Sequence, residues 1–141
     1  MAASIASQGT EVRLAVFRLS RRLRLEKTDD ELSDTQFGVL AVLNRHGAHT
    51  LSALADRERV TAPSMNRTVN YLEERGYLRR DADEEDRRRS NIVITEAGAA
   101  VVRETIAKRD AWLTSRIRRL PPQERAILIE AAEIIGRIAA E

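Results

Sequence analysis

The sequence predicts a mainly α-helical fold with one small β-hairpin, which places it in the α+β class. Apolar residues recur every three or four positions along most of the chain, as they do on the buried face of a helix. The spacing changes between residues 77 and 95, where two short strand-like runs flank a polar stretch. Hydrophobic residues make up 43% of the chain but aromatic residues only 4%, so we expect an aliphatic core. A length of 141 residues fits a single domain over residues 1–141.

The first helix is expected from about Thr10 to Thr28, with arginines opposite its apolar side. The apolar residues are Val12, Ala15, Val16, Leu19 and Leu23. A second helix is expected after Ser33, because Ser33 and Gln36 have the spacing of a capping box. Gly47 is expected to end this helix, since glycine tolerates the left-handed backbone that closes many helices.

Two short helices and a hairpin are expected next. Thr50 and Thr61 are suited to cap the two helices, and Pro63 is tolerated in the first turn of the second. The second helix has one apolar stripe and ends before Gly76. The stripe consists of Met65, Val69 and Leu72. Residues 77–80 and 90–95 then predict two paired strands, with the charged residues 81–89 between them.

Two further helices complete the chain. Thr95 is expected to cap a long helix over about residues 96–119, which Pro121 and Pro122 interrupt before an isoleucine-rich last helix. The terminal helices, at about 10–28 and 96–140, carry more apolar surface than a monomer of this length is expected to cover. We therefore expect them to form the interface of a symmetric homodimer.

Residues 33–95 have the element order of a winged helix-turn-helix lobe. The last short helix of such a lobe enters the major groove of DNA, where base edges present distinguishable donors and acceptors. The candidate DNA-binding residues of this helix are Thr61, Pro63, Ser64, Asn66, Arg67 and Asn70. A surface helix of an ordinary bundle also carries polar residues opposite an apolar stripe, so this helix alone is compatible with both interpretations.

The tip of the hairpin supplies a second candidate DNA contact. Its residues are Asp86, Arg87, Arg88 and Arg89. Arginines on a projecting hairpin can contact phosphates or enter a narrow minor groove, although a charged run is also typical of a solvated surface. Acidic residues 83–85 would repel DNA, so we expect them on the far side of the tip or paired with arginines.

These elements form an ordered pattern along nearly the whole chain. It comprises Leu32-Ser33-x-x-Gln36-x-x-Val39-Leu40, Thr50-Leu51-x-x-Leu54-Ala55, Arg67-x-Val69-x-x-Leu72-Glu73-x-x-Gly76, Arg80, Asp86-Arg87-Arg88 and Ile94-Thr95-x-x-Gly98. The pattern resembles the MarR family of bacterial winged helix-turn-helix transcriptional regulators. One departure is that Glu84 follows Asp83 where the family usually has proline, so the wing is expected to be more mobile than usual.

The resemblance implies a homodimer whose first and last helices interlock. It also implies a recognition helix that carries Ser64, Asn66 and Arg67, and a wing whose Arg88, supported by Asp86, enters the minor groove. The implied function is regulation of transcription, by default repression, through a pseudo-palindromic duplex operator. The resemblance further implies release by a small-molecule effector. Arginines of the first helix either hold an anionic aromatic effector or lie in solvent.

Other classes of function have little support in the sequence. The chain has no cysteine, so thiol chemistry and thiolate metal sites are excluded. We expect no enzyme, cofactor or metal site, because His46 and His49 flank a turn and no catalytic or phosphate-binding motif occurs. No apolar run is long enough to span a bilayer, and we expect a cytoplasmic protein. The alternative is a helical protein–protein interaction module without specific DNA binding.

Overall fold

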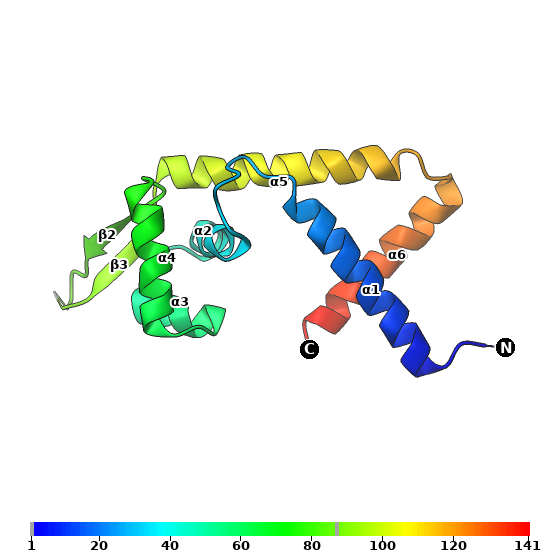
Figure 1. Ribbon diagram of the computed structural model, residues 1–141, viewed down its shortest axis with the longest axis horizontal. Coiled ribbons are helices and arrows are strands. Elements are labelled where there is room, and N and C mark those ends of the chain that lie inside the picture. Colours follow the sequence, from blue (N-terminus) through cyan, green and yellow to red (C-terminus); the bar gives the residue numbers. More distant parts are fainter. Residues whose placement is uncertain (1, 87) are drawn as a thin grey trace. The chain divides into compact units, whose positions relative to one another are not determined.

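The computed structural model describes residues 2–86 and 88–141 (Figure 1). Its helices are α1 (Ile5–Arg24), α2 (Asp34–His46), α3 (Leu51–Glu58), α4 (Ala62–Glu74), α5 (Glu96–Ile117) and α6 (Pro122–Ala139). Its strands are β1 (His49–Thr50), β2 (Leu78–Ala82) and β3 (Ser90–Ile94). The expected mainly helical fold with a β-hairpin is therefore confirmed.

The chain divides into two compact units. One consists of the chain up to Leu23 together with Arg109–Glu141, and the other is Arg24–Lys108. The boundary falls within α5, so this helix contributes to both units. The single domain expected from the sequence stays a prediction, and the two units are described separately below.

The core of the Arg24–Lys108 unit is aliphatic. Its fully buried side chains come from α2, α3, α4, β2, β3 and α5, and each removes apolar surface from water, which is the main stabilising contribution to a fold of this kind. The largest of them are Leu40, Leu43, Leu54, Met65, Leu72, Leu78 and Ile92. The stripe expected on the second short helix is thus the buried face of α4, and its opposite face remains accessible.

Local sequence signals set most helix boundaries. The Ser33 hydroxyl accepts a hydrogen bond from the Gln36 amide, and the Gln36 side chain accepts one from the Ser33 amide, which confirms the capping box. Thr50 and Thr61 cap α3 and α4 as expected. One helix end was not expected, because Arg59, a non-glycine residue, adopts the left-handed conformation with φ of 55° at the end of α3.

The bounds expected for the first helix were wrong at both ends. α1 begins at Ile5 because the Ser4 hydroxyl accepts a hydrogen bond from the Ser7 amide and caps the helix. It ends at Arg24 because the following residues bond to other elements instead of continuing the helix. For example, the Thr28 amide donates to the Thr105 hydroxyl of α5.

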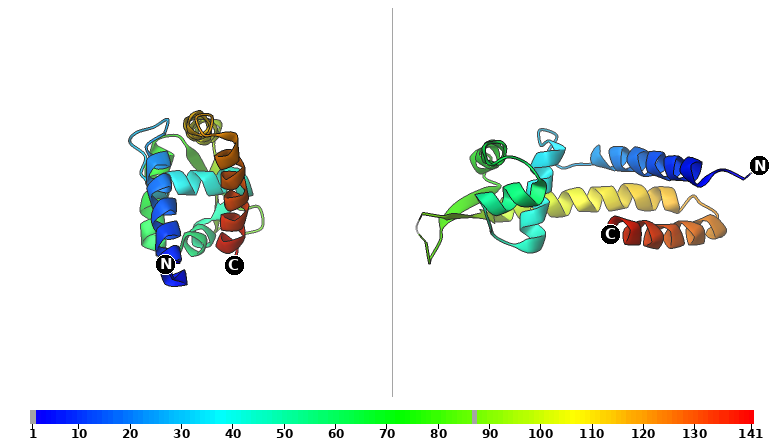
Figure 2. Two further views of the ribbon diagram at one scale, coloured as in Figure 1. Left: turned by 90° about the vertical axis from the view of Figure 1, so that its right-hand side faces the viewer. Right: turned by 90° about the horizontal axis from the view of Figure 1, so that it is seen from below.

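The hairpin belongs to a three-stranded antiparallel sheet in the order β1-β3-β2. β1 was not expected from the sequence, because two residues are too few to show alternation. Arg80 on β2 lies opposite Ile92 on β3. Figure 2, in its right-hand view, shows the hairpin extending past α3 and α4.

The base of the hairpin is fastened to the start of α5. The Thr95 amide donates to the Tyr77 carbonyl at 3.0 Å, and the Thr95 hydroxyl donates to the Gly76 carbonyl at 2.6 Å. The same hydroxyl accepts from the Gly98 amide at 3.2 Å, which confirms Thr95 as the helix cap. A Cβ atom on Gly98 would lie 2.1 Å from the Tyr77 carbonyl oxygen, so glycine is required for this close approach.

An ionic cluster joins the loop between α1 and α2 to the end of α4. Asp29 accepts hydrogen bonds from the Arg75 guanidinium at 2.5 Å and from the Tyr77 hydroxyl at 2.6 Å. A second nitrogen of Arg75 donates to Glu31 at 2.7 Å. Burial of Asp29 by itself raises the pKa of its carboxyl group, but the hydrogen bonds from Tyr77 and Arg75 outweigh burial and hold that pKa below its usual value.

Asp29→Asn is expected to lower the free energy of unfolding at pH 7 by roughly 2 kcal/mol, because it removes the charged acceptor of Arg75. A depressed carboxyl pKa stabilises the fold above the unfolded-chain value of about 3.9, and this contribution is lost as pH falls through the folded-state pKa. The difference in free energy of unfolding between Asp29→Asn and the unmodified protein should therefore narrow below about pH 4. Urea unfolding at pH 7 and below pH 4 measures this difference. Asp30→Asn, at an exposed neighbour, is the control and should change little.

Candidate nucleic-acid interface

Three of the candidate residues shape the start of α4. The Thr61 hydroxyl accepts a hydrogen bond from the Ser64 amide at 3.2 Å, and Pro63 lies within the first turn, as expected. The carbonyl of Ser64 accepts a hydrogen bond from the Thr68 hydroxyl. The side chain of Thr61 is thus engaged in capping, and its role is to present the first turn of the helix.

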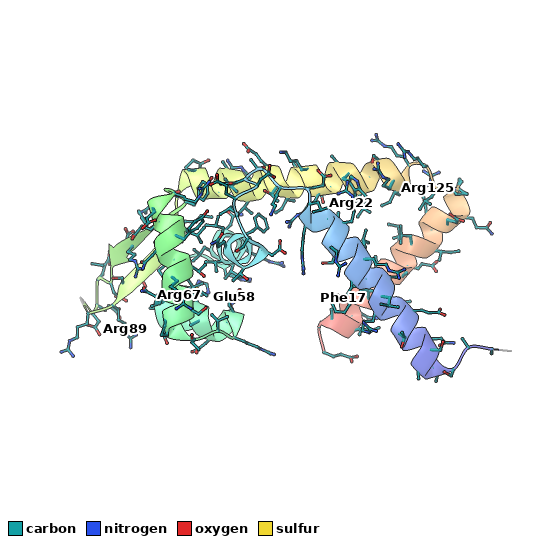
Figure 3. All side chains as sticks on the ribbon, viewed as in Figure 1. Phe17, Arg22, Glu58, Arg67, Arg89 and Arg125 are labelled. Carbon is teal, nitrogen blue, oxygen red and sulfur yellow. The ribbon has the colours of Figure 1, made fainter. Side chains whose placement is uncertain are left out.

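Arg67 is an exposed arginine of α4, and it is labelled on this helix in Figure 3. Among the residues that the structure describes, its guanidinium has no hydrogen bond or ion pair. Glu73, an acidic residue of the same helix, has Arg80 as its described partner, at 3.7 Å. Arg67 is therefore available to a ligand that approaches the outer face of α4.

Asn66 and Asn70 are brought together by a residue that the sequence analysis did not place in the site. One nitrogen of the Arg80 guanidinium donates to the Asn70 side-chain oxygen at 2.6 Å and to the Asn66 side-chain oxygen at 3.1 Å. The alternation of a strand could have revealed this arginine, since Arg79 and Arg80 must face opposite sides of β2. Arg79 instead pairs with Asp81 on its own strand at 3.1 Å.

Asp86 organises the tip of the hairpin. Its side chain accepts a hydrogen bond from the Arg88 amide at 3.0 Å, and its carbonyl accepts one from the Arg89 amide at 3.0 Å. The Arg89 guanidinium also lies 3.9 Å from the Asp86 carboxylate, an exposed contact that contributes little stability. Figure 3 shows Arg89 at the end of the hairpin. Arg87 lies outside the described residues.

Basic and acidic residues of the hairpin line different cavities. A cavity of about 480 Å³ lies between the start of α3 and the hairpin. Its polar lining consists of Thr50, Ser52, Asp56, Arg80, Arg88, Arg89 and Ser90. A second cavity, of about 360 Å³, is lined by Asp81, Asp83, Glu84 and Glu85 with Ala48, Asn91 and Val93. The carboxylates therefore do not share the cavity that Arg88 and Arg89 line, which fits the expectation that they lie on the far side of the tip.

The other unit contains an apolar groove between α1 and α6. The groove has a volume of about 210 Å³ and contains almost no polar surface. Its lining residues are Val12, Arg13, Val16, Phe17, Ile135, Ile138 and Ala139. Phe17 and Ile138 are 59% and 62% exposed, which is unusual for side chains of this size. The guanidinium of Arg13 lies 6.0 Å from the centre of the Phe17 ring.

Arg22 of α1 lies against an aromatic ring. Its guanidinium lies 4.3 Å from the centre of the Trp112 ring, and Arg116 lies 4.9 Å from the same ring. The indole nitrogen of Trp112 is buried without a hydrogen-bond partner among the described residues. Two guanidinium groups of this unit therefore lie close to the Trp112 ring.

Within residues 2–86 and 88–141, His, Cys, Asp and Glu side chains do not form any group of three or more that could hold a metal ion. None of the helices described is both long and apolar enough to cross a bilayer.

Comparisons with known proteins agree with this geometry. Residues 32–90 match the family model described as the MarR family. The chain is 37% identical over 132 residues to an uncharacterised HTH-type transcriptional regulator of Mycobacterium bovis, in an alignment that covers 94% of this chain and 92% of the relative.

Two solved structures share the fold. One is a MarR family protein of Bacillus stearothermophilus, with a TM-score of 0.82, 20% identity, and coverage of 99% of this chain and 100% of that chain. The other is BpsR of Bordetella bronchiseptica, whose DNA binding is regulated by 6-hydroxynicotinic acid, with a TM-score of 0.63, 23% identity, and coverage of 96% and 98%. The chain belongs to the MarR family, and it is a transcriptional regulator with a winged helix-turn-helix DNA-binding fold rather than an enzyme.

Proposed function

We propose that this protein binds a pseudo-palindromic duplex operator as a homodimer and represses transcription by blocking the promoter. The observation that carries the proposal is Arg67 on α4, which is exposed and has no ion pair within residues 2–86 and 88–141, in the same unit as a hairpin whose tip carries Arg88 and Arg89. A helix for the major groove and a basic hairpin for the adjacent backbone or minor groove are the two contacts that a winged helix makes with DNA.

The proposed homodimer is supported by the groove between α1 and α6. The side chains that line this apolar groove are largely exposed in a single chain. Covering them with a second copy would stabilise the dimer by about 25 cal/mol for each Å² of apolar surface removed from water. A two-fold axis would then present two copies of α4 to half-sites about one DNA turn apart, roughly 34 Å.

Release by a small molecule is part of the proposal. It is supported by the regulation of BpsR by an anionic aromatic compound, 6-hydroxynicotinic acid. We propose the same chemical class for this chain, because Arg22 and Arg116 offer positive charge beside the Trp112 ring. Since the proposed target is chromosomal DNA, we place the protein in the cytoplasm.

Recovery of genomic fragments by the purified protein tests the proposal. We expect a small set of fragments that share a pseudo-palindrome, with affinities that fall steeply as salt rises, because binding releases counterions from phosphates. Failure to enrich any sequence, together with binding that is insensitive to salt, would instead favour the interaction module, for which the exposed isoleucines of α6 are the supporting observation.

Arg67→Ala is expected to weaken operator binding by roughly 1–3 kcal/mol, because a guanidinium on a recognition helix contacts base edges or an adjacent phosphate. Fluorescence anisotropy with a labelled operator measures this change. Arg57→Ala, an exposed arginine in the last turn of α3, serves as a charge-matched control and should lose less affinity. Equal affinity of Arg67→Ala and the unmodified protein would remove Arg67 from the interface.

Asp86→Ala is expected to weaken operator binding, although the substitution removes a negative charge facing a polyanion. The reason is that Asp86 holds the amide of Arg88 and so orders the tip. Glu84→Ala removes the same charge from a residue that lines the acidic cavity and has no side-chain hydrogen bond among the described residues, and it should leave affinity unchanged or raise it. Binding isotherms at two salt concentrations compare the variants. Tighter binding by Asp86→Ala would mean that the hairpin is a diffuse phosphate contact.

A further inference from the structure

A single guanidinium fixes two side chains of α4. One terminal nitrogen of Arg80, Nη2, lies 2.6 Å from Oδ1 of Asn70 and 3.1 Å from Oδ1 of Asn66. The two asparagines are four residues apart and therefore share one face of the helix. Nη2 carries two hydrogens, so it can donate to both amide oxygens at the same time.

The chemistry of the groups dictates which way each amide points. Arginine has only donors, whereas an asparagine amide has an oxygen that accepts and an NH₂ group that donates. The oxygens of Asn66 and Asn70 must therefore face Arg80, and their NH₂ groups must point away from it. Hydrogen bonds from a charged donor are about twice as strong as those between neutral groups, so the reverse orientation is strongly disfavoured.

Arg80 is itself held in place. Its Nε lies 3.7 Å from a carboxylate oxygen of Glu73 on α4, and only 28% of its side chain is exposed. Its backbone lies in β2, paired with Ile92 of β3. To contact a phosphate, the Arg80 guanidinium would have to break its contacts with three partners on α4. The neighbouring Arg79 has no such contacts on α4, and its side chain is 56% exposed.

We propose that Arg80 is a specificity-determining residue that commits Asn66 and Asn70 to presenting hydrogen-bond donors to DNA. An unconstrained asparagine reads adenine with both its oxygen and its NH₂ group. With their oxygens turned to Arg80, these asparagines would instead select base edges that offer acceptors alone, namely O6 and N7 of guanine or O4 of thymine. This inference rests on the proposed function, because it assigns a preference to the same DNA-binding face.

Selection from random duplexes by Arg80→Met tests the preference. The unmodified protein is expected to select guanine or thymine at the positions under α4. Arg80→Met frees both amides, and the ratio of adenine to guanine at those positions should rise about tenfold. Arg79→Met is the matched control, since it removes the same charge from the neighbouring strand residue. It should leave base preference unchanged. An unaltered preference in Arg80→Met, with a uniform loss of affinity, would overturn the inference and make Arg80 a phosphate contact.

Asn70→Asp separates donor from acceptor. An aspartate keeps an oxygen for Arg80 but has no hydrogen to donate, so preference at the position under residue 70 should disappear. Retained preference would mean that the oxygen reads the base, and the inference would be wrong.

A measurement without DNA distinguishes this inference from the proposed function. The side-chain NH₂ signals of Asn66 and Asn70 in a ¹⁵N–¹H NMR spectrum should both shift in Arg80→Met and stay in place in Arg79→Met. If the unmodified protein selects no DNA sequence, the proposed function fails, and these signals still decide whether Arg80 orients the amides. If a consensus is selected while neither signal moves in Arg80→Met, the inference alone fails.

Discussion

Phe17→Glu is expected to convert the proposed homodimer into monomers and to weaken operator binding by at least about 100-fold, because two linked half-site contacts become one. Phe17 lines the groove between α1 and α6 and is 59% exposed in a single chain. A carboxylate there would have to be buried when a second copy covers the groove, and pairing with the nearby Arg13 would offset only part of the cost of removing the charge from water. The folding of one chain should be affected little, since the side chain is largely outside its core.

Phe17→Leu is the matched control, because it keeps an apolar side chain at the same position and should remain dimeric. Sedimentation at micromolar concentration gives the oligomeric state, circular dichroism confirms that both variants are helical, and anisotropy gives operator affinity. A Phe17→Glu protein that stays dimeric would show that this groove is not the interface. A monomeric unmodified protein would contradict the dimeric operator complex itself.

Gly98→Ala is expected to lower the free energy of unfolding by roughly 3 kcal/mol, a large effect for one methyl group. The new Cβ would lie 2.1 Å from the Tyr77 carbonyl oxygen and 2.9 Å from a side-chain carbon of Ile94. The oxygen belongs to the backbone and already accepts a hydrogen bond from Thr95, so it cannot rotate away. The start of α5 would have to move off the base of the hairpin.

Gly38→Ala is a control with the opposite expected sign. Gly38 lies within α2, and a Cβ there would meet nothing within 4 Å. Alanine should therefore stabilise the helix by roughly 0.5–1 kcal/mol through its better helix propensity. Urea denaturation of both variants compares the two glycines. A Gly98→Ala protein as stable as Gly38→Ala would show that the hairpin base tolerates displacement.

The fold was predictable from the sequence where short-range chemistry decides it. The capping box at Ser33, the caps at Thr50, Thr61 and Thr95, and the stripe of α4 each depend on residues within one or two turns. The side chains that α4 presents outward follow from that stripe, because the buried face determines the accessible one. The candidate residues of α4 are accordingly exposed or half-buried, and none belongs to the core.

Several missed features depend on contacts between different elements. Asp29 meets Arg75 across 46 positions, and no local pattern marks either residue as a partner. Strand alternation separates Arg80 from Arg79, but the asparagines that Arg80 contacts lie on another element, so these partners appear only when β2 is packed beside α4. The end of α1 was misplaced for the same reason, because the hydrogen bond of Thr28 to Thr105 outweighs the helical pattern of the first segment.

The many bonds of the loop between α1 and α2 have a mechanical consequence. Lys27 donates to the Leu32 carbonyl and receives the Lys108 side chain at its own carbonyl, while Thr28 is bound to α5 and Asp29 to the end of α4. A connection bonded at successive residues has no slack with which to absorb a displacement. A displacement of this loop would therefore move the last turn of α4 with it, unless the hydrogen bonds of Arg75 to Asp29 and Glu31 break first.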